Sequence, residues 1–522
     1  MNIIYSLFLI VILLTGAAPC QSSKTQSGVR KSSFKTRNTS TDAAKRFARF
    51  DAQLEDLRNM LRIPGMSAAV VKDRKVVWSK GFGFADYENK VPANENTPYR
   101  IASLTKTFAS TLLLQLVQQG KVSLDDPMSQ YSVDFKDDSV KVRHIISHTS
   151  EGVPGAKYQY NGDRYAYLDA VIEKATGKTF RELLTENILA RLKMSDTVPG
   201  QDVLEKPNKI KDSLDAKALR HYENVLARLA KPYNLYGDSQ IILTPYPIKR
   251  ITTAADFIST VVDLAKYDAA IDRHLFIKKE SQEKAWTPSV SNDGQTLPYG
   301  LGWFVQNYQG VRLVWHNGQW SNFSGLLLKV PEKNLTFILL ANSGALSTPF
   351  GMGSSGDVTK SPFALTFLRM FVFEDLLRRA LPDPDWKLEP EKMSNVIAGF
   401  EKETGGYDYK RELQARQVIY DWRNRRRSRE RKEIKVDSKI LDAYVGTYEL
   451  RPFPLVITKE GDKLMAVGPT LPEAVELFAA SETEFFLKAA EADVTFVRDT
   501  QGKVTHLMLR IFGQNIHAEK LK

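Results

Sequence analysis

The spacing of hydrophobic and polar residues changes several times along the chain and predicts a mixed α+β protein. Residues 42–61 repeat apolar positions three and four apart, which indicates an amphipathic helix. Two apolar runs, 65–71 and 76–82, then flank the charged segment 72–75 and predict a β-hairpin. The N-terminal third of the chain therefore combines helix and sheet.

A second helical pattern starts at Ser103, because Pro98 disfavours helix just before it and the apolar spacing of a helix follows it. Residues 299–341 later hold several apolar runs that predict at least three antiparallel strands. Asn317-Gly318 is a dipeptide typical of hairpin turns. We therefore expect His316 to end its strand with its side chain at an open edge.

Four further segments differ in their pattern of apolar and polar residues. Residues 180–250 are mixed, charged and mostly helical in pattern, and we interpret them as a cap beside a pocket. Residues 251–267 resume a helical spacing, and residues 360–435 read as a helical, increasingly basic connector. Residues 436–522 alternate in short apolar runs separated by turns, which predicts a small all-β barrel or sandwich.

The composition permits full hydrophobic cores and argues against nucleic-acid binding. The chain has 522 residues, 43% of them hydrophobic, and a net charge of +12. The excess of positive charge lies in the N-terminal tail and in residues 423–435, and neither stretch carries an RNA or DNA motif. We interpret both as solvated segments and expect no nucleic-acid partner.

The N-terminus predicts export. Residues 3–14 are almost wholly apolar and the small residues 16–18 follow, a pattern typical of a secretory signal, although no Lys or Arg precedes it. We expect a periplasmic or extracellular protein. Cys20 is the only cysteine, so disulfides and cysteine-rich zinc sites are excluded. Pro19 favours cleavage near Cys20 over lipid attachment, and membrane attachment is expected only if Cys20 is lipidated.

The pattern Ser-x-x-Lys occurs three times, at Ser32, Ser103 and Ser281. The copy that joins Ser103 to Lys106 stands in an apolar context at a predicted strand-to-helix turn, where residues three apart share a helix face. A serine hydroxyl becomes a good nucleophile when a nearby base removes its proton, and a buried lysine can be that base. The middle copy is therefore a candidate catalytic pair.

A metal site is an alternative chemistry. His144 and His148 are four residues apart and could share a helix face, but no glutamate follows His144 as a zinc-protease motif requires. We favour a structural role, in which His148 bonds to backbone at the end of a helix.

Several motifs in order resemble the serine β-lactamase-like family, which contains class C β-lactamases, D,D-peptidases and related esterases. Residues 97–106 look like its nucleophile segment, with Ser103-Leu104-Thr105-Lys106 as S-x-x-K. Residues 148–152 resemble its His-Thr-Ser-Gly loop with one residue inserted, Tyr160-Asn161-Gly162 stands where the family has Tyr-x-Asn, and His316-Asn317-Gly318 where it has Lys-Thr-Gly or His-x-Gly. The resemblance covers about residues 60–345.

This resemblance implies an antiparallel sheet flanked by helices, as in β-lactamases and transpeptidases, with an appended β-rich domain. We accordingly divide the chain into a signal peptide (1–20), a disordered linker (21–41), a serine hydrolase domain (42–359, cap about 180–250), a helical basic connector (360–435) and a C-terminal β-rich domain (436–522).

The resemblance also implies residue roles. Ser103 would attack a carbonyl carbon, Lys106 and Tyr160 would share its proton, and His316 would hold the substrate and tune that network. The backbone N–H groups of Ser103 and Gln319 would form the oxyanion hole. The expected substrate-binding residues are Gly318, Gln319, Asn161 and Trp320. The family chemistry needs no metal and no organic cofactor.

One departure from the family bears on the substrate. Gly162 replaces the asparagine of Tyr-x-Asn, which puts recognition of peptides and β-lactams in doubt unless Asn161 or Asp163 substitutes. The leading hypothesis is an exported hydrolase of an amide or ester, whether peptide, β-lactam or carboxylic ester, with a small molecule or a peptide, cell-wall peptide included, as its substrate. The alternatives are a penicillin-recognising or cell-wall-binding protein that acylates without efficient turnover, and a non-catalytic surface module.

Overall fold

The structure, a computed structural model, describes residues 39–205, 214–246, 250–373, 395, 398–399, 402, 407–428, 430–450, 454–468, 471–489, 492–511 and 514–521. The chain divides into two compact units, Met1–Lys45 and Arg46–Lys522, and the second carries the features that follow. Within the described part, no helix is both long and apolar enough to cross a bilayer. The predicted signal peptide and most of the predicted linker, including Cys20, lie outside the described residues.

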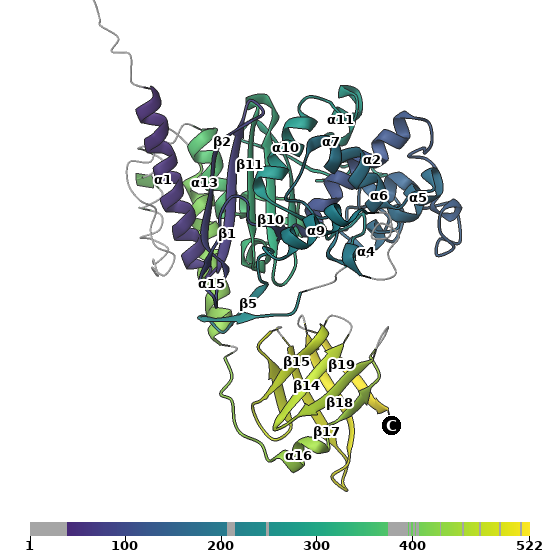
Figure 1. Ribbon diagram of the computed structural model, residues 1–522, viewed down its shortest axis with the longest axis vertical. Coiled ribbons are helices and arrows are strands. Elements are labelled where there is room, and N and C mark those ends of the chain that lie inside the picture. The colour runs from purple at the N-terminus through teal and green to yellow at the C-terminus, as the bar shows by residue number, and fades with distance from the viewer. Residues whose placement is uncertain are drawn as a thin grey trace, which may run out of the picture. The chain divides into compact units, whose positions relative to one another are not determined.

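The centre of the hydrolase part is a seven-stranded antiparallel sheet in the order β3-β2-β1-β11-β10-β9-β8 (Figure 1). The pairing of β1 with β11, for example Ala69 opposite Ile338, joins the two sequence-distant halves of this sheet. The strands are β1 (Gly65–Lys72), β2 (Lys75–Asp86), β3 (Val91–Pro92), β8 (Phe304–Tyr308), β9 (Val311–Gln319), β10 (Ser324–Val330) and β11 (Leu335–Ala341).

One face of the sheet is covered by helices from both ends of the hydrolase part. Phe50 and Leu54 of α1 (Thr39–Met60) lie one turn apart and are fully buried. They share a core with Phe367 of α13 (Pro362–Phe371) and with the aromatic and aliphatic side chains of α15 (Tyr409–Arg427). Figure 1 shows these three helices together on one side of the sheet. The helix predicted to begin at residue 42 thus begins at Thr39.

The opposite face is covered by a larger set of helices, among which α10 packs on β1, β2 and β11 (Figure 1). Successive residues of β1 alternate between the two cores, as a strand buried on both faces must. The helices on this side and around it are α2 (Thr105–Gln118), α3 (Val142–Ile146), α4 (Gly162–Tyr165), α5 (Leu168–Thr176), α6 (Phe180–Leu184), α7 (Ala190–Leu192), α9 (Ala216–Leu226), α10 (Val261–Ile271) and α11 (Lys279–Ala285). The short helix α12 (Met352–Ser355) joins the core on the first face through Met352.

The C-terminal part is a closed eight-stranded antiparallel barrel, preceded by the short helix α16 (Ser438–Asp442). Its core contains side chains such as Tyr448, Phe496 and Leu507. The strands are β12 (Gly446–Tyr448), β13 (Leu455–Glu460), β14 (Lys463–Gly468), β15 (Leu471–Ala479), β16 (Glu484–Leu487), β17 (Ala492–Arg498), β18 (Val504–Ile511) and β19 (Gln514–Leu521). The predicted fold class is therefore confirmed, with a barrel in place of the alternative sandwich.

The prediction of a hairpin turn at Asn317-Gly318 is wrong. Strand β9 runs through both residues to Gln319, and the reversal follows it, where Trp320 N–H donates to the carbonyl of Phe323 at 2.8 Å. Gly318 is needed for close approach instead, because a Cβ there would lie 2.3 Å from the Ile101 carbonyl oxygen. His316 consequently lies inside a central strand and is fully buried, not at an open edge.

Two other patterns gave incomplete predictions. The segment 251–267 is not one helix: Ile258–Ser259 forms the short strand β7, which pairs with β4 (Tyr99–Arg100), and α10 begins only after the N-cap Thr260. The charged segment 180–250 contains helices but also a hairpin, β5 (Tyr233–Tyr236) with β6 (Gln240–Leu243). Much of the predicted connector 360–435 lies outside the described residues.

Candidate active site

Ser103 lies at the turn that joins β4 to α2. The 3-10 turn Ala102–Leu104 leads directly into α2, and Ala102 adopts the left-handed conformation, with φ of 47°. Such a backbone is costly for a residue with a Cβ and commonly marks a functional site. Because β9 packs on this turn through Gly318, the half-buried Ser103 is fixed between a helix N-terminus and a strand.

Lys106 lies one turn further along α2 and contacts Ser103. Its Nζ donates hydrogen bonds to Ser103 Oγ at 3.0 Å and to the Ala254 carbonyl oxygen at 2.8 Å. The side chain is 1% exposed. Burial lowers the pKa of Lys106 to about 7, because the ammonium loses its hydration. A substantial fraction of this amine is therefore neutral near pH 7 and able to accept a proton.

The negative charges of two carboxylates partly oppose this lowering of the Lys106 pKa. Asp256, and after it Asp163, raise the pKa of Lys106 through their negative charge and keep it from falling further. Asp256 is buried in a left-handed conformation, with φ of 87°. Its Oδ1 accepts the Trp320 indole N–H at 2.9 Å and lies 3.6 Å from Arg100 Nε. The segment 254–256 thus supplies Lys106 with a hydrogen-bond acceptor, the Ala254 carbonyl, and with the negative charge of Asp256.

Tyr160 is the third member of the predicted catalytic group, and its phenol lies near enough to Ser103 for that side chain to lower the phenol pKa, against the larger effect of burial. Lys106 Nζ lies 5.0 Å from the centre of its ring. Burial raises the pKa of the Tyr160 phenol well above its usual value, so the hydroxyl keeps its proton at neutral pH. The ring of His148 packs on the ring of Tyr160, with 4.2 Å between their centroids. Lys106 therefore contacts both Ser103 and Tyr160.

His316 is held neutral in one tautomer. The Asn317 carbonyl can only accept, so His316 Nδ1–H donates to it at 2.7 Å, and Nε2 accepts the Tyr299 hydroxyl proton at 2.9 Å. Burial first, and the charge of Lys106 second, lower the pKa of His316 to about 3. Its ring centroid lies 6.3 Å from that of Tyr160, so His316 borders the catalytic group while both of its ring nitrogens bond elsewhere.

The four predicted substrate-binding residues fall in different settings. Gly318 and Gln319 end β9, and the Gln319 side chain is exposed. Trp320 is half-buried, with its indole fixed by Asp256. Asn161 is committed elsewhere: its Oδ1 caps α4 by accepting Arg164 N–H, and its Nδ2 donates to Glu151 at 2.6 Å. The amide of Asn161 therefore does not replace the family asparagine that Gly162 lacks.

Three contributions escaped the sequence reasoning. The Ala254 carbonyl, Asp256 and Tyr299 lie in segments without a motif, and backbone carbonyls carry no sequence signal at all. Asp256 offered one indirect signal, because aspartate is among the few residues that tolerate a left-handed loop position. The two histidines considered as metal ligands each accept a backbone N–H: Lys141 N–H donates to His144 Nδ1, and Asn161 N–H donates to His148 Nδ1 at 3.2 Å, which confirms the predicted backbone bond of His148. The ring of His148 also packs on tyrosines.

Comparison with known proteins agrees with this fold. The family model described as beta-lactamase matches residues 50–351, more than half of the chain, and a domain of unknown function (DUF3471) matches residues 430–520. The chain belongs to the beta-lactamase family and is a serine hydrolase, as the motifs predicted.

Individual relatives are distant. Penicillin-binding protein 4* of Bacillus subtilis strain 168 is 22% identical over 466 residues, which span 81% of this chain and 87% of that protein. Protein flp of Staphylococcus aureus strain MW2 is 25% identical over 329 residues, 55% of this chain and 61% of that protein. The solved octameric penicillin-binding protein homologue from Pyrococcus abyssi covers 91% of this chain and 100% of its own, at 21% identity and a TM-score of 0.50.

Proposed function

We propose that this protein is an exported serine hydrolase that cleaves small esters or amides through an acyl-enzyme on Ser103. The observation that carries the proposal is the pairing of a nucleophile with a neutral base. Lys106 Nζ lies 3.0 Å from Ser103 Oγ, and burial brings the pKa of this lysine to about 7. A general base works best when its pKa lies near the working pH.

Acylation follows from these positions. As Ser103 Oγ bonds to the substrate carbonyl carbon, its proton passes to the neutral amine of Lys106, and the carbonyl oxygen becomes an oxyanion. The backbone N–H groups of Ser103 and Gln319 receive this charge, each worth about 3–4 kcal/mol to the transition state. The carbon–leaving group bond then breaks, and the departing oxygen or nitrogen takes a proton that Lys106 returns through the Tyr160 hydroxyl.

Deacylation reverses the proton path. A water molecule adds to the acyl carbon and gives its proton to the Lys106–Tyr160 pair, and the bond to Ser103 Oγ breaks as the serine recovers a proton. Tyr160 serves as a relay because its raised pKa keeps the phenol protonated, so that it accepts one proton as it gives another. His316, neutral and fixed by Tyr299, holds the wall of the site without taking part in proton transfer.

Two observations favour compact ester or amide substrates over peptides and β-lactams with long acyl side chains. Residue 162 has no side chain to contact a substrate amide. The side-chain amide of the neighbouring Asn161 is already hydrogen-bonded to Glu151 and to the Arg164 N–H at the start of α4. Trp320 directly follows Gln319, the last residue of β9, and is anchored by Asp256, and we infer that its ring narrows the approach to the oxyanion donors. A carboxylic ester needs none of the missing amide contacts.

The test is steady-state and burst kinetics with a short chromogenic ester and a penicillin, on wild type and Ser103→Ala. We expect turnover of the ester, slower reaction with the penicillin, and loss of both in the variant. Absence of turnover with either substrate, in a protein shown to be folded, would contradict the proposal.

A second function is favoured by the same glycine. If the site acylates but its deacylation is slow, the protein is a penicillin-recognising or cell-wall-binding protein, and Gly162 is the observation that supports this. The kinetics distinguish the two: a burst of one equivalent followed by almost no turnover favours the second function. Sustained turnover of the ester favours the first.

The exported location rests on the apolar residues 3–14 and the small residues after them. Cell-wall peptide is then one accessible substrate or partner, beside small molecules. N-terminal sequencing of the mature protein, together with cell fractionation, tests this: a new N-terminus near Cys20 in the exported fraction supports export. Retention of Met1 in the cytoplasmic fraction contradicts it.

A further inference from the structure

Three side chains that can bind metals gather on the outer surface of the barrel. In the β18–β19 pair, His506 lies directly opposite Glu519, and His517 precedes Glu519 by two residues. Because side chains alternate along a strand, all three share one face. The buried Leu507 and Ala518, which alternate with them, face the barrel core. The fold therefore brings together residues that are apart in sequence.

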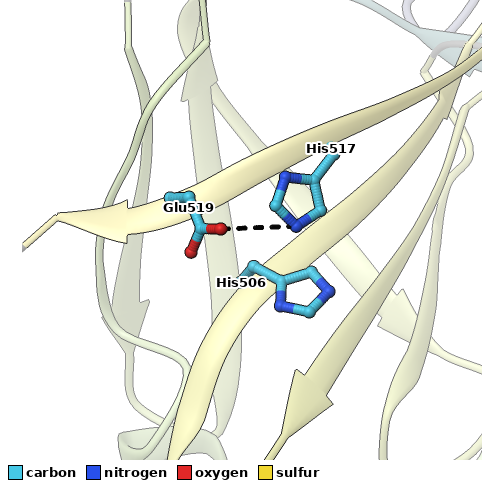
Figure 2. A group of neighbouring side chains, drawn as sticks. All are labelled: His506, His517 and Glu519. Carbon is cyan, nitrogen blue, oxygen red and sulfur yellow. Dashed lines mark ion pairs between the residues drawn. The ribbon is translucent and has the colours of Figure 1, made fainter.

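The distances suit a single ion. One ring nitrogen of each histidine and a carboxylate oxygen of Glu519 all lie within 4.8 Å of one another. His517 Nε2 is 3.6 Å from Glu519 Oε1, and the two imidazole centroids are 4.2 Å apart. Figure 2 shows the rings side by side with the carboxylate directed at His517. Two donors on a tetrahedral zinc ion stand about 3.3 Å apart, so small side-chain rotations complete the geometry.

An adjacent residue prepares one ligand. Thr505 Oγ1 lies 2.9 Å from His506 Nδ1 and donates its single proton to the Val497 carbonyl at 3.4 Å. When the hydroxyl donates to this carbonyl, it accepts from His506 Nδ1–H, and the lone pair of Nε2 is left for a metal. A hydrogen bond of this kind on the far ring nitrogen is a regular feature of metal-ligating histidines. It is independent of the clustering itself.

We propose that His506, His517 and Glu519 form a surface site for a divalent transition-metal ion of the Zn²⁺ class. Two imidazole nitrogens and one carboxylate oxygen suit Zn²⁺, Cu²⁺ or Ni²⁺, whereas Ca²⁺ and Mg²⁺ prefer all-oxygen ligands. Three protein ligands leave at least one position for water. The site binds metal in the barrel and takes no part in the hydrolysis proposed for Ser103.

The position of the site suggests what the metal does. Strand β19 closes the barrel against β12 through two residue pairs, Thr447 with Leu521 and Tyr448 with Lys520, among the described residues. It meets β18 through six pairs. An ion bound by residues of both β18 and β19 would strengthen the attachment of β19 to β18. Bound Zn²⁺ should therefore stabilise the native barrel by mass action.

The experiment uses the full-length protein without a histidine tag, freed of metal by a chelator. Titration with ZnCl₂ is followed by calorimetry, and titration with CoCl₂ by visible absorption, which reports nitrogen ligands directly. We expect one Zn²⁺ per chain and a rise in the melting temperature on its addition. Loss of a residue that only supports a metal ligand typically weakens metal binding about 10–100-fold, and Thr505→Val should fall within this range. His517→Ala and Glu519→Gln remove ligands and should weaken Zn²⁺ binding by more.

His221→Ala is the matched control, because His221 is an exposed histidine of α9 outside the barrel. It should leave Zn²⁺ affinity, the cobalt spectrum and the zinc-dependent melting shift unchanged. The three ligand residues are partly or fully exposed, so their variants should fold, and circular dichroism checks this. Absence of saturable Zn²⁺ binding, or binding unchanged in the double variant His506→Ala/His517→Ala, would overturn the proposal. Ester hydrolysis by Ser103 should be equal with and without Zn²⁺.

Discussion

Gly162 and Lys106 are direct neighbours: a Cβ built on Gly162 would lie 3.9 Å from Lys106 Nζ and meet nothing closer. The backbone of Gly162 is not left-handed, so the position accepts a side chain. We predict that Gly162→Asn folds normally and increases the rate of acylation by a penicillin about 2- to 10-fold, the value of one added hydrogen bond. The rate of loss of the penicillin, by absorbance, measures it.

Gly162→Ala separates the effect of the amide from that of bulk. It should leave the penicillin reaction unchanged, and both variants should retain ester hydrolysis within about threefold, because an ester uses no amide contact. A penicillin rate in Gly162→Asn equal to that of the alanine variant would show that residue 162 does not limit β-lactam recognition.

The pKa of Lys106 sets the pH profile. The active amine is the deprotonated form, and burial lowers its pKa to about 7. The value of kcat/KM should therefore rise with pH, reach half its plateau near pH 7, and fall about tenfold for each unit well below that. Replacement by methionine should reduce kcat/KM about 10²- to 10⁴-fold and abolish this limb. A wild-type profile that is flat between pH 5 and 9 would rule out lysine as the base.

Asp256 should determine the pH at which kcat/KM falls on the acid side of the profile. Its negative charge raises the pKa of Lys106, so Asp256→Asn should lower that pKa further and move the acid limb to lower pH. The amide oxygen introduced by this substitution can still accept the Trp320 indole proton, which preserves the local geometry. Asp163→Asn, on an exposed residue, should move the limb in the same direction by less. Profiles of kcat/KM for the three proteins test the order, and a limb that moves to higher pH in Asp256→Asn would contradict it.

The hydrolase core contains a buried ion pair whose loss should cost stability. Lys329 of β10 is 1% exposed and bonds to Asp268 and to Asp272, the latter at 2.9 Å. Lys329→Met should lower the free energy of unfolding by about 3–5 kcal/mol, because it leaves the buried Asp268 carboxylate without its cationic partner. Lys178→Met removes an exposed pair with Glu186 and should cost about 1 kcal/mol or less. Urea denaturation measures both, and equal costs would refute the distinction.

The sequence predicted the elements of the fold wherever periodicity was strong. The helix after Ser103 and the hairpin of β1 and β2 were predicted because each buries a regular face. The prediction from Asn317-Gly318 was wrong because pairing of these two residues with β10 outweighed the local turn preference of the dipeptide. Where local and tertiary preferences conflict, pairing of a buried strand prevails.

The site could be predicted only where a side chain sits in an ordered motif. Ser103 and Lys106 are three residues apart on one helix turn, so their contact follows from helix geometry. The Ala254 carbonyl comes from 148 residues away and exists as a partner only after folding. Asn161 looked available for substrate until its bond to Glu151, a loop contact that no periodicity encodes, was known.

The central claim is that Ser103 is an activated nucleophile. Intact mass spectrometry after incubation with a fluorophosphonate, with peptide mapping, tests it on wild type, Ser103→Ala and a control, Ser110→Ala, on the same helix. The account predicts one phosphonyl adduct per chain, located on Ser103, absent in Ser103→Ala and present in the control. An adduct on another residue, or no adduct on folded wild-type protein, would contradict it.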